Sequence, residues 1–381
     1  MSHELTAQTD RLQHWLQHEA LPLWRERGIH PELGASVERL LADGSVDEAA
    51  NTRVRVQARQ AFFFTACEDL GWCSQGTAIG RRMLAFVEQN AAHPTAGGGF
   101  THLLDPDFAV IDQRQDLYDH AFFLLAYAWQ YRVSGEARAL QSAHDLLAHF
   151  DRAFAADNGG WLEGDYPFSW RRQNPHMHLF EAFMALYEAS GETVWLARAG
   201  DMYQLFQSVF FSPQEGVLFE FFNRDWSLAP DDAGQVVEPG HMMEWVWLLD
   251  WYARLSGEDV SASIERLYRR GLELGLADSG LVYDSVRPDG TVLQATKRCW
   301  GLTELIKASL VMAARGEPEA QTRAADSVAA LFDYYLCAST PGSYVDQRGG
   351  ADEVVVDTAP ASTLYHLLVL MQELLRYRSG A

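Results

Sequence analysis

The sequence has few basic residues, few cysteines and no long apolar run. Lysine and arginine total 30 against 52 acidic residues, and the formal net charge of −22 disfavours nucleic acid and anionic membranes as partners. The four cysteines have no C-x-x-C spacing, and nothing indicates an oxidising compartment. The N-terminus lacks a basic region followed by an apolar run, and no uncharged apolar stretch would span a membrane. We therefore expect a cytoplasmic protein, either a monomer or a homodimer.

Glycine, in contrast, occurs in a recurring pattern. Five segments share a glycine or glycine pair, a short aromatic or β-branched stretch, and then acidic or turn residues; they begin at Gly97, Gly159, Gly216, Gly280 and Gly342. Their spacing is about 60 residues. Such a period indicates one structural unit that packs against its own copies, because a single unit cannot bury its apolar face. A chain of 381 residues holds six units, so we expect one domain over residues 1–381.

Between the glycine-led segments the apolar pattern is helical. Residues 117–129 are apolar on nearly all sides, which predicts a buried helix, and residues 136–150 are amphipathic, which predicts an outer helix. The same alternation recurs along the chain. It predicts an all-α fold, an (α/α)6 barrel, with short β-hairpins in the loops at one rim. An open solenoid is the alternative, but residues 365–371 are too apolar for a terminal repeat.

Polar residues recur at nearly the same phase after each glycine, where inner helices are expected to begin. They are His120, His178, His241, Trp300 with Glu304, and His366. A ring of units would bring such residues to one end, where they would form one pocket. Two of them are His-x-x-Glu pairs, because Glu181 follows His178 and Glu244 follows His241, which puts each pair on one helical face.

These residue types suit acid–base chemistry on a neutral polar ligand. Imidazole titrates near neutrality, so a histidine pair can take and return a proton. Arg59 lies in an increasingly apolar helix, so the sequence supports an inward, paired arginine that could stabilise an oxyanion at least as well as a solvated arginine. Trp247 is either part of the core or a stacking surface for a sugar ring. A helix-start histidine such as His178 is, taken alone, more often a structural residue.

Other sites are less well supported by the sequence. A metal site would need the histidines and glutamates to converge, whereas we expect the ring to spread them over different helices, without the dense acidic cluster that Mg²⁺ or Mn²⁺ prefers. No P-loop is present. A glycoside hydrolase could use two of Glu163, Glu244 and Glu304, but it would leave the histidines without a task. A non-enzymatic helical scaffold is the other alternative. We therefore expect neither a metal nor a cofactor.

The order and spacing of these motifs resemble the N-acylglucosamine 2-epimerase superfamily. The similar stretches run from about residue 53 to residue 366, and they include His176-Met177-His178, Gly240-His241-Met242-Met243-Glu244 and Tyr365-His366. The resemblance implies an (α/α)6 barrel that acts on a free sugar without metal or redox cofactor. It also implies roles for ten residues: His241 and His366 as the acid/base pair, Arg59 on the reacting oxygens, Asn174, His178 and Glu244 as their partners, and Tyr118, Trp247, Trp300 and Glu304 as sugar contacts.

The resemblance leaves two reactions open. Proton removal from C2 of an open-chain aldose gives a cis-enediolate; return of the proton to C1 makes a ketose, and return to the opposite face of C2 makes an epimer. The His-Met-His-Leu-Phe-Glu-Ala stretch at 176–182 is similar to the mannose isomerase branch. We therefore expect an aldose–ketose isomerase of D-mannose and D-fructose, with D-lyxose and D-xylulose as further substrates. A sugar 2-epimerase acting on mannose or a β-1,4-linked disaccharide is the alternative.

Overall fold

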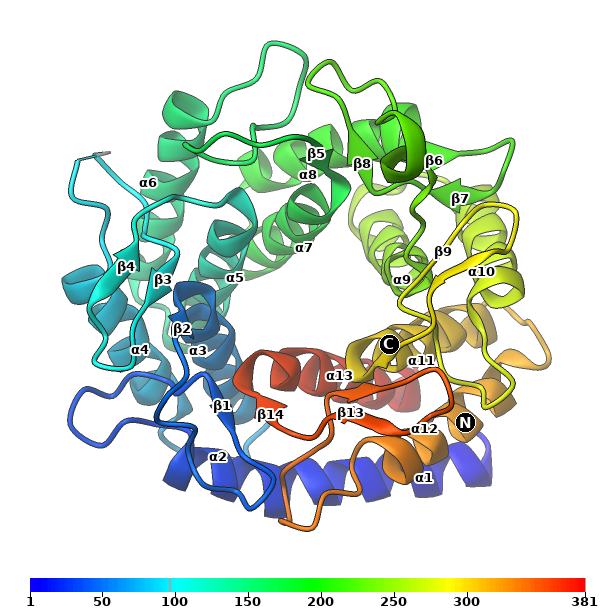
Figure 1. The fold of residues 1–381 in the computed structure, drawn as a ribbon, viewed down its shortest axis with the longest axis horizontal. Coiled ribbons are helices and arrows are strands. Elements are labelled where there is room, and N and C mark those ends of the chain that lie inside the picture. The colour runs from blue at the N-terminus through cyan, green and yellow to red at the C-terminus, as the bar shows by residue number, and fades with distance from the viewer. Residues whose placement is uncertain (96, 381) are drawn as a thin grey trace.

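Six helices form an inner ring in the computed structural model, which describes residues 1–95 and 97–380 (Figure 1). Each inner helix contacts the next, and the last contacts the first, so the ring closes. The inner helices are α3 (Val54–Asp69), α5 (Leu117–Ser134), α7 (Gln173–Ser190), α9 (Pro239–Ser256), α11 (Cys299–Ala314) and α13 (Leu364–Ser379). Closure confirms the (α/α)6 barrel and excludes the open solenoid.

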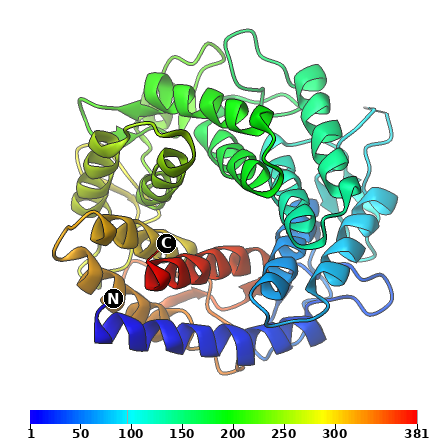
Figure 2. The same cartoon turned by 180° about the vertical axis from the view of Figure 1, so that it is seen from behind.

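The outer ring packs against the inner one and has amphipathic helices. Five outer helices are α4 (Gly76–Asn90), α6 (Ala137–Ala153), α8 (Thr193–Leu205), α10 (Ser261–Gly275) and α12 (Ala320–Tyr334). The sixth position is taken by the N-terminal helices α1 (His3–Trp15) and α2 (Leu21–Arg27), which a π-helical turn joins; α1 contacts α12 and α13 (Figure 2). The last unit therefore combines an outer helix from the start of the chain with an inner helix from its end. Within the described residues, no helix is long and apolar enough to cross a membrane.

Short antiparallel strand pairs lie at the rim where the inner helices begin. The strand before an inner helix pairs with a strand of the following unit in most cases. The pairs that join units are β2 (Thr52–Arg53) with β3 (Leu103–Leu104), β5 (Arg171–Arg172) with β8 (Phe221–Phe222), β11 (Lys297–Arg298) with β12 (Gln347–Arg348), and β14 (Ala359–Pro360) with β1 (Arg39–Leu40). The remaining strands are β4 (Val110–Asp112), β6 (Phe211–Ser212), β7 (Val217–Leu218), β9 (Ser285–Val286), β10 (Val292–Gln294) and β13 (Val354–Val356).

The glycine-led segments act as the links between neighbouring units. Their last residue, or the one equivalent to it, accepts a hydrogen bond through its carbonyl from an N–H at the start of the previous inner helix. Five junctions share this bond: Val54 to His102, Leu117 to Glu163, Gln173 to Glu220, Cys299 to Asp346 and Ala361 to Glu38. These bonds satisfy N–H groups at helix starts that have no intrahelical partner. The glycine-led segments recur about every 60 residues because, at these five junctions, each one makes this bond to the neighbouring unit.

The bond to Glu38 reveals a sixth segment, Gly34-Ala35-Ser36-Val37-Glu38, that the sequence analysis missed. Gly34 has a φ of 69° and Gly342 in the last segment has 82°, a conformation that glycine adopts without steric cost. Only some of the strands expected in the glycine-led segments are present among the described residues. Two segments contain strands β3 and β7, while Trp161 and Val282 make isolated bridges.

Candidate active site

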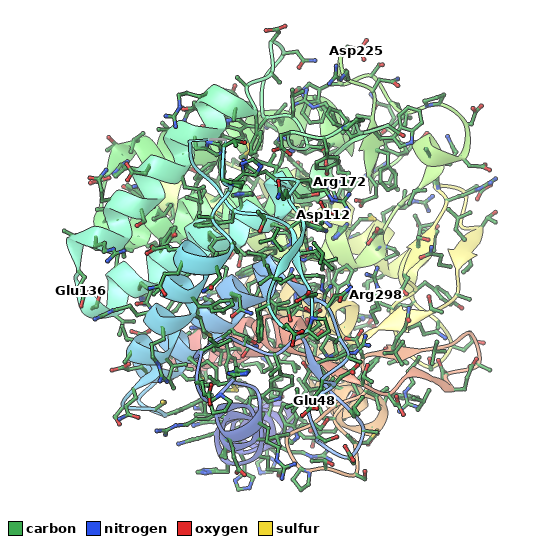
Figure 3. The ribbon with its side chains drawn as sticks, turned by 60° about the vertical axis from the view of Figure 1, so that its left-hand side comes forward. Glu48, Asp112, Glu136, Arg172, Asp225 and Arg298 are labelled. Carbon is green, nitrogen blue, oxygen red and sulfur yellow. The ribbon has the colours of Figure 1, made fainter. Side chains whose placement is uncertain are left out.

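A cavity of about 300 Å³ opens where the inner helices begin, inside the ring of rim strands. Apart from Asp346, which ends the last glycine-led segment, its walls come from all six inner helices or the residues just before them. They are Arg53, Arg55, Arg59, Tyr118, Asn174, His178, Glu238, His241, Glu244, Arg298, Trp300, Asp346, Pro360, Ser362, Thr363 and His366. Arg298, labelled in Figure 3, immediately precedes α11. Helix starts therefore converge on one pocket, as the phase of the polar residues predicts.

The imidazole rings of His241 and His366 both lie against one indole, that of Trp300. The ring centroid of Trp300 lies 5.1 Å from that of His241 and 5.7 Å from that of His366, and both rings are tilted 32° to it. Gly240 makes the first approach possible, since a Cβ there would lie 2.6 Å from the Trp300 ring. Pro239 and Gly240 thus begin α9 with the geometry that brings His241 against Trp300.

Each of the three cavity histidines has its Nδ1 atom against a glutamate. The distances are 3.0 Å from His241 to Glu220 and 3.0 Å from His366 to Glu304. His178 Nδ1 lies 3.3 Å from Glu181. Because the carboxylates occupy the Nδ1 side, the Nε2 atom of each ring is left for chemistry in the cavity.

The environments of His241 and His366 shift their pKa values in opposite directions. Burial disfavours the imidazolium of His241, but the charges of Glu220 and Glu238 outweigh it and raise the pKa to about 10. Burial dominates at His366, where it lowers the pKa to about 3 despite Glu304. The raised pKa favours the imidazolium form of His241, which can donate a proton, and the lowered pKa favours the neutral form of His366, which can accept one, a division suited to acid–base catalysis.

Three buried glutamates and a buried lysine lie close to the cavity histidines. Lys307 Nζ lies 2.6 Å from Glu304. Burial tends to raise the pKa of Glu304, but the charge of Lys307 and the hydrogen bond from His366 hold it below its usual value. Burial, with the charge of Glu304, raises the pKa of Glu244 well above normal. Glu181 completes the set.

This cluster corrects the expectation that the ring would spread the acidic residues apart. His178, Glu181 and Glu244 offer ligand atoms within 4.8 Å of one another, and so do Glu244, Glu304 and His366. Glu220, Glu238 and His241 form a third such group. These are the residues that could hold a metal ion, although the Lys307 ammonium already neutralises part of the central charge.

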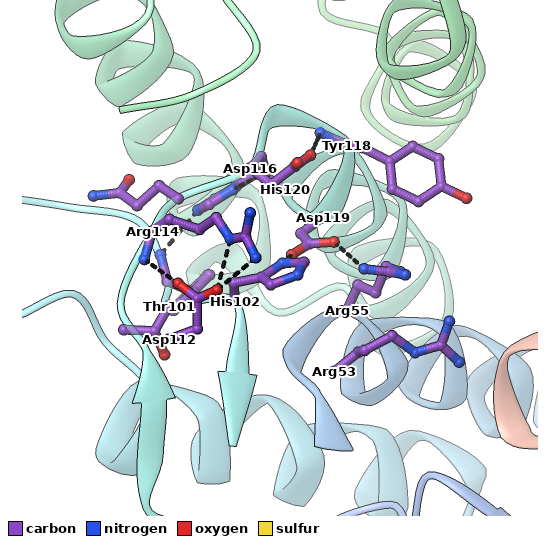
Figure 4. Close-up of polar contacts among 12 residues, drawn as sticks. Arg53, Arg55, Thr101, His102, Asp112, Arg114, Asp116, Tyr118, Asp119 and His120 are labelled. Atoms are coloured by element: carbon purple, nitrogen blue, oxygen red, sulfur yellow. Dashed lines mark hydrogen bonds and ion pairs between the residues drawn. The ribbon is translucent and has the colours of Figure 1, made fainter. Parts of the chain in front are cut away.

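Arg59 is buried among aromatic rings and reaches the cavity as a cation. Its carbon Cζ lies 3.9 Å from the centroid of Phe122, and its guanidinium donates to the Tyr118 hydroxyl at 2.8 Å and the Ser362 carbonyl at 3.3 Å. Among the described residues it has no ion pair with a carboxylate, unlike the paired arginine that the sequence predicts. By contrast, Arg55 is held by Asp119 at 2.7 Å (Figure 4).

Several buried polar atoms of the cavity have no hydrogen-bond partner among the described residues. They are Asn174 Oδ1, both carboxylate oxygens of Glu244 and Arg59 Nε. Buried polar atoms are almost always paired in proteins. Acceptors beside a guanidinium therefore match the hydroxyl groups and the developing oxyanion of a sugar.

The structure places eight of the ten residues named from the sequence on the cavity wall, and two elsewhere. Glu304 is fully buried behind His366, where it contacts the imidazole rather than the cavity. Trp247 lies two turns further along α9 than His241, beneath the Lys307 ammonium, and lines another cavity. The geometry therefore does not support a direct sugar contact for either residue.

His120 also differs from its expected position. Its Nε2 atom accepts the N–H of Phe100, just as His176 Nε2 accepts the N–H of Trp161. His120 is therefore equivalent to His176 rather than to His178, and both histidines fix glycine-led segments instead of facing the cavity.

Sequence reasoning missed the residues that act on the histidines from other units. Glu220 ends the third glycine-led segment, and its place in the period is the signal that could have found it. Lys307 follows Glu304 by three residues, the spacing of a helical ion pair. Arg53 and Arg298 each precede an inner helix, and each is held by a rim carboxylate, Glu38 or Asp284.

Comparison with known proteins agrees with this geometry. The family model for N-acylglucosamine 2-epimerase matches residues 35–369. A mannose-6-phosphate isomerase of Rhizobium meliloti (strain 1021) is 33% identical over 98% of each chain. A D-mannose isomerase of Thermobifida fusca is 27% identical over 82% of this chain and 81% of its own.

Solved structures show the same fold. The cellobiose 2-epimerase of Bacillus thermoamylovorans B4167 superposes with a TM-score of 0.85 at 18% identity, over 97% of this chain and 99% of that one. At this identity the likeness concerns the barrel alone.

Proposed function

The chain belongs to the N-acylglucosamine 2-epimerase family, and from this premise we propose that it is an aldose–ketose isomerase that interconverts D-mannose and D-fructose. The observation that carries the proposal is the pair of cavity histidines, His241 and His366, whose rings both lie against Trp300 and whose Nδ1 atoms each lie 3.0 Å from a glutamate. Two relatives named as isomerases of mannose or mannose 6-phosphate favour isomerisation over epimerisation.

In the proposed reaction, the His241 imidazolium donates a proton to the ring oxygen as the sugar opens. The neutral imidazole that results takes the proton of the O1 hydroxyl, so the open-chain aldehyde forms and His241 is again an imidazolium. Neutral His366 then removes the C2 proton, whose electron pair forms the C1–C2 double bond while O1 becomes an oxyanion. The Arg59 guanidinium, which has no carboxylate partner among the described residues, stabilises that charge. Without this stabilisation, the free energy of forming the oxyanion would add to the activation free energy of the reaction.

The reaction is completed by two further proton transfers. The hydroxyl proton on O2 moves to O1. Glu244 suits this shift, because its raised pKa favours a carboxyl that can give its proton to O1 while its other oxygen accepts the proton from O2, and neither oxygen has a hydrogen-bond partner in the described chain. His366 then returns its proton to C1, and a C2 carbonyl forms. No proton is gained or lost overall, so the same groups serve both directions.

Epimerisation is the second candidate, because an imidazolium and a neutral imidazole on opposite faces of C2 would also serve it. The family description itself names an epimerase. The two reactions differ only in whether the proton returns to C1 or to the far face of C2. Product identity therefore separates them.

The cavity mouth also bears on the substrate. Arg53 and Arg298 line it with side chains 31% and 37% exposed. Arg53 is held by Glu38, and Arg298 by Asp284 and Glu238, but a guanidinium has five N–H donors, so donors remain for a ligand. This favours testing the sugar 6-phosphate beside the free sugar, as the name of the Rhizobium relative suggests.

The experiment incubates the protein with D-mannose, D-lyxose or mannose 6-phosphate, with and without chelator, and separates the products by chromatography. Ketose formation that His241→Asn and His366→Asn each abolish, with unchanged circular dichroism, is expected. Glucose as the product from mannose would instead favour the epimerase. Chelator sensitivity would assign a role to the carboxylate cluster as a metal site.

A further inference from the structure

A second cavity, of about 340 Å³, opens at the opposite end of the barrel, where the inner helices end. Its walls come from the later turns of α3, α5, α7, α9 and α13. Aromatic side chains of Trp129, Trp247 and Trp251 line it, and so does one residue from the centre of the barrel, Glu181. We call it the rear cavity, and the cavity with the histidines the front cavity.

Glu181 connects the two cavities through one histidine. It lines the rear cavity, and its Oε2 atom lies 3.3 Å from Nδ1 of His178, which lines the front cavity. The side chains of both residues are 3% exposed. Tyr365 donates its hydroxyl hydrogen to the same carboxylate oxygen, which fixes the position of Glu181.

We propose that Glu181 is a proton-relay residue through which the front cavity exchanges protons with solvent in the rear cavity. The inference rests on the proposed sugar reaction and concerns its proton traffic. A sugar bound in the front cavity blocks the direct route between the reacting groups and the water outside. A path through the floor would keep exchange open while the substrate is bound.

The relay needs no net change of charge or electrons. His178 accepts a proton from a sugar hydroxyl at Nε2 and gives its Nδ1 proton to the Glu181 carboxylate. Glu181 then gives a proton to water in the rear cavity. The hydroxyl concerned is the one that forms when the His366 imidazolium gives the proton taken from C2 to an enediolate oxygen. The reverse sequence returns a solvent proton to this oxygen and from it to neutral His366, so one proton leaves and one enters.

The pKa shifts of His178 and Glu181 favour proton transfer from the imidazole to the carboxylate. Burial raises the pKa of Glu181 to about 7, against the hydrogen bond from Tyr365 and the charge of Lys307. Burial lowers the pKa of His178 well below its usual value. The other ionisable groups around Glu181 are Glu304 of α11, Glu244 of α9 and His366 of α13. A carboxyl that titrates near neutrality can both hold and release a proton at working pH.

The test follows the deuterium content of the ketose formed from the aldose in D₂O, measured by NMR at C1 early in the reaction. Wild-type protein incorporates deuterium because the abstracted proton exchanges with solvent before it returns. Glu181→Gln keeps the size and polarity of the side chain but cannot relay a proton. We expect its deuterium content to fall about tenfold with KM unchanged, since a positioned acid–base group is worth at least that factor.

Controls separate the relay from structural damage. Glu188→Gln changes another carboxylate that lines the rear cavity, and should incorporate deuterium like wild type. Ala185, one turn after Glu181, also lines this cavity; Ala185→Leu would shield Glu181 and lower exchange, whereas Ala185→Ser would not. These variants leave the front cavity untouched, so they decide the question even if Glu181→Gln is inactive.

Wild-type deuterium content in an active Glu181→Gln protein, or in Ala185→Leu, would overturn the relay. Failure of the wild-type protein to convert any sugar would instead defeat the proposed function.

Discussion

Replacement of Glu220 by glutamine should move the alkaline limit of activity. Glu220 Oε1 lies 3.0 Å from His241 Nδ1, and its charge is the main reason that the pKa of His241 rises to about 10 against burial. A charge-assisted hydrogen bond contributes about 1.5–3 kcal/mol, which is about one to two pKa units. Glutamine keeps the size of the side chain, and the backbone carbonyl that accepts the Gln173 N–H is unchanged.

The assay is the pH dependence of kcat/KM for mannose between pH 6 and 10.5, corrected for the non-enzymatic rate. The pH profile of kcat/KM reports the pKa values of the free enzyme. In Glu220→Gln, the alkaline limb should therefore shift to lower pH by about one to two units, with little change in activity at pH 7. The charge of Glu238, 3.6 Å from His241 Nδ1, also raises the pKa of His241 and so limits the shift. Glu265→Gln on the exposed surface of α10 is the control. An unmoved alkaline limb would refute the assignment of His241 as the acid.

Three more predictions concern packing and charge. Gly240→Ala would push the neighbouring indole of the cavity wall aside and lower kcat/KM by about tenfold or more, whereas Gly200→Ala, whose nearest neighbour would be 3.4 Å away, should be silent; equal activity of both variants would contradict this. Lys307→Met leaves Glu304 buried without its cation and should lower the free energy of unfolding by about 3–5 kcal/mol in urea titrations, with recovery when Glu304→Gln is added; a stability loss below 1 kcal/mol would contradict it. Burial and Arg171 lower the pKa of His176 to about 3. Below pH 6.5 this histidine is therefore protonated in the unfolded chain but not in the native protein, and the free energy of unfolding decreases as the pH is lowered. The stability advantage of wild type over His176→Gln should thus shrink by about 2 kcal/mol between pH 6.5 and 5, and a constant difference in urea melts would disprove it.

The barrel itself could be predicted because its period appears in the chain. Glycines that turn the chain, apolar inner helices and amphipathic outer helices recur every unit, and closure buries what a single unit cannot. The sixth segment at Gly34 escaped because the unit it belongs to is split between the two ends of the chain. Its role became visible only through the bond from Ala361 to Glu38.

The site was predictable to the extent that its residues lie in the first turns of inner helices. His241, His366 and Asn174 occupy such turns and reach the front cavity. Residues further along a helix than its first turns do not reach the front cavity. Trp247 shares a face with His241 but lies too far along α9, because face-sharing in a sequence says nothing about height above the cavity floor.

Charges could not be predicted from the sequence, because each pKa depends on residues of other units. Glu220 approaches His241 from the third glycine-led segment, and Lys307 reaches the carboxylates from α11. The spacing of three residues is a local signal for the Lys307–Glu304 pair, but no local pattern reports the approach of Glu220 to His241. The opposite pKa shifts of His241 and His366 therefore emerge only when the ring is closed.

The most direct test of the proposed isomerase is incubation of the protein with D-mannose in D₂O, followed by NMR. The account predicts fructose that carries deuterium at C1. Glucose with deuterium at C2, or mannose that remains unchanged, would contradict it.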